Sequence, residues 1–223
     1  MRGVAWAAPT AAVLVAAPAL AMSCSQPVAY TAPLNTANYK RTNNKSGTGT
    51  ARSTVTGSAA ITYTISSVAS AGQTLVSNNL SVAGDINNGY NGAGSLTTDG
   101  LQLQQSGATT GQTVSITFSR PVTNLSVMVA DIDRTSSTHA DIVSFSPAPS
   151  TVTNGRGVQG AGTASSPLTA KAVGEVTSDT VANRSTVTFA GPLTTLTVRF
   201  GSSVGTASQQ VFLAGLSFSA TPC

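Results

Sequence analysis

The chain has 223 residues, of which only 8% are charged and 5% are aromatic, and its 11 Lys and Arg residues slightly outnumber its 7 Asp and Glu residues. The resulting formal charge of +4 is small and scattered, so it gives no argument for a nucleic-acid partner. The length suits one all-β domain, and no segment after residue 21 has the length and apolarity of a membrane helix.

Residues 1–21 are predicted to be a secretory signal peptide. Arg2 supplies a positive charge, the run from Val4 to Leu20 is apolar or small, and the run ends in the small-x-small cleavage site Ala19-Leu20-Ala21. Residues 22–223 are then expected to form a single domain that is secreted or displayed at the cell surface.

Two cysteines, Cys24 and Cys223, lie almost at the two ends of the predicted mature chain. An exported protein meets oxidising conditions, so this pair predicts a disulfide that joins the termini. The alternative is lipid attachment at Cys24. Against it, Ala21-Met22-Ser23 lacks the Leu or Val that a bacterial lipobox carries three residues before its cysteine.

Four cations, Lys40, Arg41, Lys45 and Arg52, follow near the predicted mature N-terminus, with Gly, Asn and Thr between them. This composition favours a solvated loop or sheet edge over a patch that binds anionic polymers.

Alternation of apolar and hydroxyl-bearing residues predicts β-strands along most of the mature chain. Apolar residues fall on odd positions between Val55 and Ile65, and they alternate with Ser and Thr from Val114 to Phe118. The run from Leu125 to Ile132 is apolar at both parities, which predicts a central strand covered on both faces. Further strands are expected at residues 74–83, 95–104, 140–146, 168–176, 185–190, 193–200 and 209–219.

The expected fold is an all-β, two-sheet antiparallel sandwich of jelly-roll-like type. Turn residues such as Asn154-Gly155 separate the strands, and no segment outside the signal has a helical period with caps. The buried parity changes around Ala214-Gly215, which predicts a β-bulge there. Residues from Val152 to Pro167, rich in Gly, Ala, Ser and Thr, are expected to form a long surface loop.

The segment FSRPVTNLSVMVADIDR (118–134), followed by Asp141-Ile142-Val143 and later by TFAGPLTTLTVRF (188–200), resembles domains of secreted and cell-surface bacterial proteins. QQVFLAGLSFSA (209–220) is similar to their last strand. The resemblance covers roughly residues 75–219, and it implies an adhesion-type or carbohydrate-binding sandwich with no established reaction.

Three aspartates gather at the end of this strand and the start of the next. Side chains two apart on a strand point to the same face, so Asp131 and Asp133 are expected to converge, and Asp141 would join them if residues 134–140 formed the connecting turn of a hairpin. Three carboxylates with backbone carbonyls would suit calcium, which makes Asp131, Asp133 and Asp141 the candidate metal ligands and calcium the candidate cofactor. The alternative is a structural clamp in which Asp131 or Asp133 accepts backbone amide bonds at the end of the strand while Arg134 pairs with a neighbour.

Catalysis has less support. An acid pair at Asp131 and Asp133 could hydrolyse glycosides, but the mature chain has no Trp to line a cleft. His139, the single histidine, has no G-x-S-x-G nucleophile elbow to serve, so no catalytic residue is assigned and a secreted hydrolase is the weakest functional class.

Two functional classes therefore lead. The first is a non-catalytic, adhesin-like interaction domain that binds a surface protein or glycan. The second is a carbohydrate-binding module, in which Tyr90 and Asn91 of Asn88-Gly89-Tyr90-Asn91-Gly92 are the candidate ligand-binding residues, because an aromatic ring can stack on a sugar while amides bind its hydroxyls.

Overall fold

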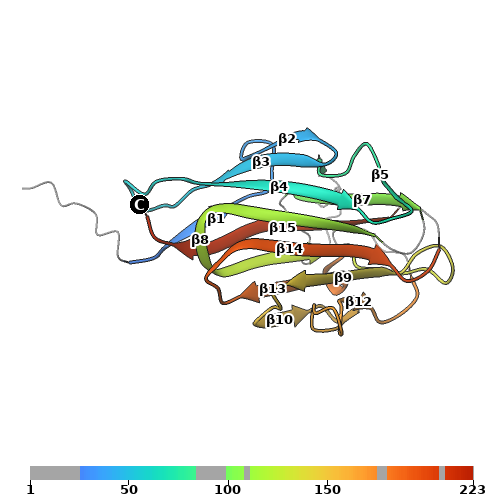
Figure 1. The fold of residues 1–223 in the computed structure, drawn as a ribbon. Helices are drawn as coiled ribbons and strands as arrows, with labels where there is room; N and C mark the ends of the chain where they lie inside the picture. Colours follow the sequence, from blue (N-terminus) through green and yellow to red (C-terminus); the bar gives the residue numbers. More distant parts are fainter. Residues whose placement is uncertain (1–25, 84–98, 108–110, 175–179, 206–208, 223) are drawn as a thin grey trace, which may run out of the picture.

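The computed structural model describes residues 26–83, 99–107, 111–174, 180–205 and 209–222. Every strand pair in these residues is antiparallel, and their one helical element is the single 3-10 turn η2 (Val181–Asn183). The predicted all-β, two-sheet antiparallel sandwich is confirmed (Figure 1), whereas the jelly-roll order of connections stays a prediction. The predicted signal peptide, the two cysteines, Tyr90 and Asn91 lie outside the described residues. Among the described residues no helix is long and apolar enough to cross a membrane.

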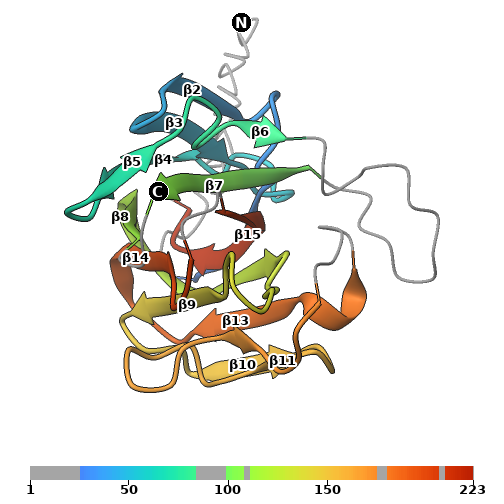
Figure 2. The same ribbon diagram turned by 90° about the vertical axis from the view of Figure 1, so that its right-hand side faces the viewer.

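The strands form two layers that share one long strand. The first layer contains, in order, β2 (Tyr39–Asn43), β3 (Ser46–Ala51), β4 (Ile61–Ala69), the first half of β8 (Gln112–Ala130), β14 (Leu193–Ser202) and β9 (Asp141–Ser146). The second contains β10 (Thr151–Asn154), β13 (Ser185–Phe189), the second half of β8, and β15 (Gln209–Ala220), followed along the far side of β15 by β7 (Gly100–Gly107) and β1 (Val28–Ala32). The short strands β5 (Gln73–Leu75) and β6 (Val82–Ala83) pair with β7, and β11 (Val158–Gln159) pairs with β12 (Thr169–Ala170) (Figure 2).

Strand β8 passes from one layer to the other. Ile116 lies opposite Ile65 of β4 and Leu196 of β14, whereas Val127 lies opposite Val187 of β13 and Leu216 of β15. The two strands expected on either side of Arg120-Pro121 are therefore one continuous strand. The change of partners lies near Pro121, which is exposed and has no amide hydrogen to donate to a ladder.

The core lies between the layers, where the alternating apolar positions of both layers face each other. The rings of Phe118 and Phe218 meet edge to face with centroids 5.2 Å apart, and Tyr30 stacks on Phe218 at 5.7 Å. Each of these three aromatic residues is at most 3% exposed. Such residues contribute much of the burial free energy of a core.

The predicted bulge is confirmed, because the β8–β15 register shifts between Ala214 and Leu216 and Gly215 has a φ of +53°. That backbone conformation favours glycine, and the extra residue turns the following apolar side chains back toward the core.

Three local expectations were wrong. Strand β4 begins at Ile61, and Val55 is 42% exposed, because the alternation before residue 60 has no partner strand to pair with. Residues 152–167 are not one long loop, since β10 pairs with β13 and Val158 of β11 is buried. The strands expected at 74–83 and 168–176 shrink to the short elements β5, β6 and β12.

Strands β1 and β15 bring the two ends of the described chain together. Val28 lies opposite Ala220, and the Ala59 amide donates to the carbonyl of Pro222 at 2.9 Å. The segments that precede residue 28 and follow residue 220 therefore leave the sandwich from the same edge.

Candidate functional site

The aspartate segment forms a tight corner between β8 and β9. The Asp141 amide donates to the Asp133 carbonyl at 3.0 Å, and Arg134 forms a bridge with Ala140. Residues 134–140 therefore form a closed turn that places Asp141 beside Asp133, whereas β9 itself pairs with β14.

Asp141 acts on the backbone of the corner. Its Oδ2 accepts a hydrogen bond from the Asp133 amide at 3.1 Å, and its side chain is almost fully buried. Its Oδ1 is buried without a hydrogen-bond partner. Burial raises the pKa of Asp141 well above its usual value, and the negative charges of Asp133 and Asp131 raise it further, although the backbone hydrogen bond from Asp133 opposes them. The corner therefore favours the protonated carboxyl group.

The Asp133 carboxylate instead contacts the histidine of the same turn. His139 Nε2 lies 2.7 Å from Asp133 Oδ1. The opposite edge of the imidazole faces a neighbouring hydroxyl, because Nδ1 lies 3.5 Å from Thr138 Oγ1. Thr135 Oγ1 accepts hydrogen bonds from the amides of Thr138 and His139 at 3.0 and 3.2 Å. The imidazole thus closes the turn by bonding across it.

Asp131 is the first residue after β8 and begins the corner. Strand β8 ends at Ala130, and Asp131 has a φ of +68°, so the alternation of faces stops before the aspartates begin. Gln210 Nε2 of β15 donates to Asp131 Oδ2 at 3.4 Å. The described part of the chain holds no group of three or more His, Cys, Asp or Glu residues placed to hold a metal ion, and the calcium site expected at Asp131, Asp133 and Asp141 stays a prediction.

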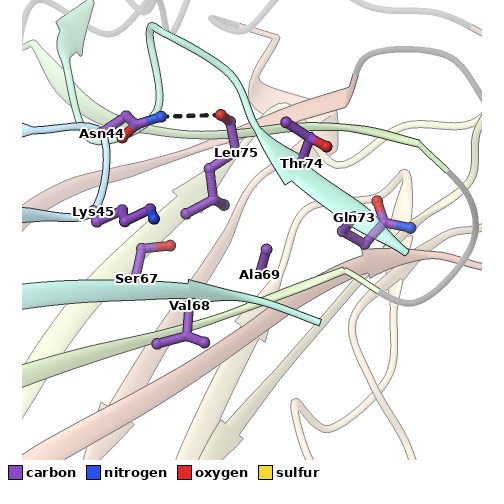
Figure 3. Close-up of a pocket in the computed structure, with 8 residues that line it drawn as sticks. All are labelled: Asn44, Lys45, Ser67, Val68, Ala69, Gln73, Thr74 and Leu75. Atoms are coloured by element: carbon purple, nitrogen blue, oxygen red, sulfur yellow. Dashed lines mark hydrogen bonds between the residues drawn. The ribbon is translucent and has the colours of Figure 1, made fainter. Parts of the chain in front are cut away.

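A cleft of about 680 Å³ opens at the edge of the first layer that lies opposite β9 and the aspartate corner. It lies between the turn that joins β2 to β3, the end of β4, and β5. Figure 3 shows Ser67 and Ala69 pointing into it from β4, and Leu75 pointing toward them from β5. Lys45 extends from the turn into the same space. The remaining lining residues are Asn44, Val68, Gln73 and Thr74. This volume is within the range of small-molecule sites.

Hydrogen bonds hold the walls of this cleft in place. Asn44 Nδ2 donates to the carbonyls of Leu75 at 3.0 Å and Val76 at 3.3 Å, which fixes the turn against β5. Ser67 Oγ donates to Gln112 Oε1 at 2.7 Å, and the Ser67 amide donates to the Lys45 carbonyl at 2.8 Å. These hydrogen bonds therefore hold the walls of the cleft in place without a ligand.

Lys45 gives the cleft its charge. Within the described residues its exposed ammonium group makes no hydrogen bond or ion pair, and no carboxylate lines the cleft. Arg41, from the same basic segment, has a structural role because its guanidinium donates to the carbonyls of Asn79 and Ser77. The cleft thus offers one positive charge among neutral amide and hydroxyl groups, which suits a hydroxylated ligand with one negative charge.

Sequence reasoning identified the corner and missed the cleft. The residues of the cleft come from three separate segments, 44–45, 67–69 and 73–75, and no motif joins them. Comparison with known proteins adds no relative, since no family model, curated protein or solved structure matches this chain.

Proposed function

We propose that this protein is a secreted, non-catalytic binding domain of the adhesin-like type, and that the cleft of Figure 3 is its binding site. The observation that carries the proposal is the contrast between the two candidate sites. The carboxyl groups of the corner that could perform acid–base chemistry are buried and hydrogen-bonded there. The open cleft instead contains groups that bind, and none of the described residues that line it is an Asp or a Glu.

The second candidate function is a carbohydrate-binding module. The side-chain amide of Gln73 and the hydroxyl of Thr74 match the hydroxyl groups of a sugar, and the Lys45 ammonium matches a carboxylate. Leu75 and Ala69 supply a small apolar wall for a sugar ring. A uronic-acid oligosaccharide combines these properties.

A binding screen separates the two candidates. The secreted protein is applied to immobilised oligogalacturonate, to its uncharged carboxyl-reduced form, and to a panel of immobilised extracellular proteins. Retention on oligogalacturonate alone supports the carbohydrate-binding module, and retention on a protein supports the adhesin.

In either case Lys45→Gln should weaken binding by roughly tenfold, as expected for the loss of one charge-assisted hydrogen bond. Lys40→Gln is the matched control, because Lys40 is an exposed lysine of the adjacent strand and does not line this cleft. Binding that Lys45→Gln leaves at the wild-type level would place the site elsewhere.

A further inference from the structure

Three glutamines stand in place of apolar residues at the end of the core that borders the cleft of Figure 3. They are Gln105 of β7, Gln112 of β8 and Gln209 of β15, and each is at most 4% exposed. Two positions away on the same strands, on the same faces, lie the core residues Leu103, Val114 and Val211. The interior therefore changes from apolar side chains to amides where it approaches the cleft.

Strand pairing places these amides next to the walls of the cleft. Gln112 lies opposite Ala69 of β4, and Gln105 lies opposite Leu75 of β5. Ala69 and Leu75 both line the cleft, as Figure 3 shows. Gln209 lies opposite Gln105 on the next strand. Because residues opposite each other on paired strands share a face, the three amides continue the walls of the cleft toward the core.

The Gln112 amide lies directly behind the lining of the cleft. Its Oε1 accepts a hydrogen bond from Ser67 Oγ at 2.7 Å, and Ser67 lines the cleft. Among the described residues, no group accepts a hydrogen bond from the buried Gln112 Nε2. The two polar side-chain atoms of Gln209 are likewise buried without a partner in this part of the chain. Burying an N–H group without an acceptor costs free energy, which a leucine or a methionine at the same position would avoid.

The Gln112 Nε2 group needs an acceptor oxygen, and apolar side chains lie beside it. Ala69 is its cross-strand neighbour, and Leu75 points toward Ala69 from β5. The acetyl part of an acetamido group supplies both a carbonyl oxygen and a methyl group to such surroundings. A hydroxyl group could accept from Nε2, but it would bring its own O–H into the buried end of the cleft and would leave the apolar wall uncovered.

We propose that the cleft binds an acidic sugar that carries an acetamido group, and that Gln112 determines the specificity for this group. The Ser67 hydroxyl turns aside so that Gln112 Nε2 can donate to the acetyl oxygen. The acetyl methyl group packs against Ala69 and Leu75, and the Lys45 ammonium pairs with the carboxylate. The inference rests on the carbohydrate-binding function proposed above, and it narrows the ligand from acidic sugars in general to those with an acetamido group.

The test measures the affinity of the purified protein for two matched pairs of acidic sugars by titration calorimetry. The first pair is the methyl glycoside of N-acetylneuraminic acid and its analogue with a hydroxyl group in place of the acetamido group. The second pair is a hyaluronan tetrasaccharide, which carries carboxylate and acetamido groups on neighbouring sugars, and tetragalacturonate. The acetamido member of at least one pair should bind about tenfold more tightly than its partner, as expected for one hydrogen bond and one buried methyl group.

Gln112→Met should lower the affinity for the acetamido sugar to that of its partner, because methionine fills a similar volume without the Nε2 donor. The partner sugar should bind this variant as it binds the wild type. Gln159→Met is the matched control and should keep the preference, because Gln159 is an exposed glutamine of β11 that does not line the cleft. Lys45→Gln should weaken both members of the pair, which separates recognition of the carboxylate from recognition of the acetamido group.

Thermal unfolding checks that each variant is folded, and the comparison of matched sugars on the wild type needs no variant. Equal affinities within both pairs, weakened by Lys45→Gln, would overturn this inference and leave the proposed binding site in place. A folded Gln112→Met protein that keeps the wild-type preference would also overturn it, and the buried amides would then hold internal water only. Binding of none of the four sugars would overturn both the inference and the carbohydrate-binding function.

Discussion

Replacing Asp141 by asparagine should stabilise the protein at neutral pH. The carboxyl group is buried beside Asp133, and its pKa is raised, first by burial and then by the neighbouring negative charges. Asparagine resembles the protonated carboxyl group: its oxygen can accept the Asp133 amide, and its NH2 group can donate toward the Asp133 carboxylate. The substitution therefore removes the cost of ionising a buried group and keeps the hydrogen bond that closes the corner.

The free-energy contribution of the hydrogen bond between the Asp133 amide and residue 141 follows from a comparison with alanine at position 141. Asp141→Ala also removes the charge, but it leaves the buried Asp133 amide without its acceptor, which costs about 1–3 kcal/mol. The unfolding free energy should therefore rank Asn above Ala by about 1–3 kcal/mol. This comparison isolates the clamp from the effect of the charge, since both variants are neutral at position 141.

The pH dependence of the unfolding free energy tests independently whether folding raises the pKa of Asp141. Because the pKa of Asp141 is raised on folding, the folded protein holds a proton at pH values where the unfolded chain has released it. Unfolding releases that proton, so the unfolding free energy of the wild type falls as pH rises through the folded pKa. The wild type should consequently approach Asp141→Asn as the pH is lowered, while the gap between Asn and Ala stays constant.

Urea titrations of the three proteins at pH values from about 5 to 8 measure these differences directly. A wild type that is more stable than Asp141→Asn over this whole range would show that the carboxylate is ionised and stabilised in the corner. A gap between wild type and Asp141→Asn that does not change with pH would refute the linkage to Asp141.

Two further outcomes test the sandwich itself. Gly49→Ala should lower the unfolding free energy by about 1–3 kcal/mol, because a Cβ at this position would overlap the buried Tyr63 ring. The control Thr48→Ala, on the exposed face of the same strand, should change the unfolding free energy by less than about 0.5 kcal/mol. Equal effects of the two substitutions would contradict the packing of Gly49 against Tyr63. Protein produced in an oxidising compartment should gain the mass of two hydrogen atoms on reduction and lose about 2–4 kcal/mol of unfolding free energy. The reason is that Val28, four residues after Cys24, lies opposite Ala220, three residues before Cys223. An added mass that reductant does not change would instead indicate lipid on Cys24.

At the aspartate corner, the local sequence predicts the turn but not the direction of every carboxyl group. A turn between Asp133 and Asp141 could be expected from the sequence, because a short polar connection separates two apolar runs. The partner of the second run could not, because β9 pairs with β14 and not with β8. The direction of Asp131 was not, because it depends on where β8 stops pairing and on a left-handed backbone conformation at that residue. Alternation along a strand therefore cannot give the direction of the Asp131 side chain, because β8 ends one residue before it.

The sequence by itself determined the class of fold. Alternation with a period of two, abundant Thr and Val, and turns of Gly and Asn are local properties, and each favours an extended chain with one face buried. The same local pattern placed the bulge at Gly215, since a change of parity can be seen in a single strand.

Only the tertiary structure decided which residues became neighbours. Thr48, Thr64, Thr117 and Thr195 are ordinary exposed strand positions in sequence, and the pairing of four strands in one register aligns them in a row. Likewise, Lys45 and Ser67 share a cleft because the turn before β3 folds over the end of β4. Register depends on the packing of the whole core, since a slip of one residue would turn every side chain of a strand to the opposite face.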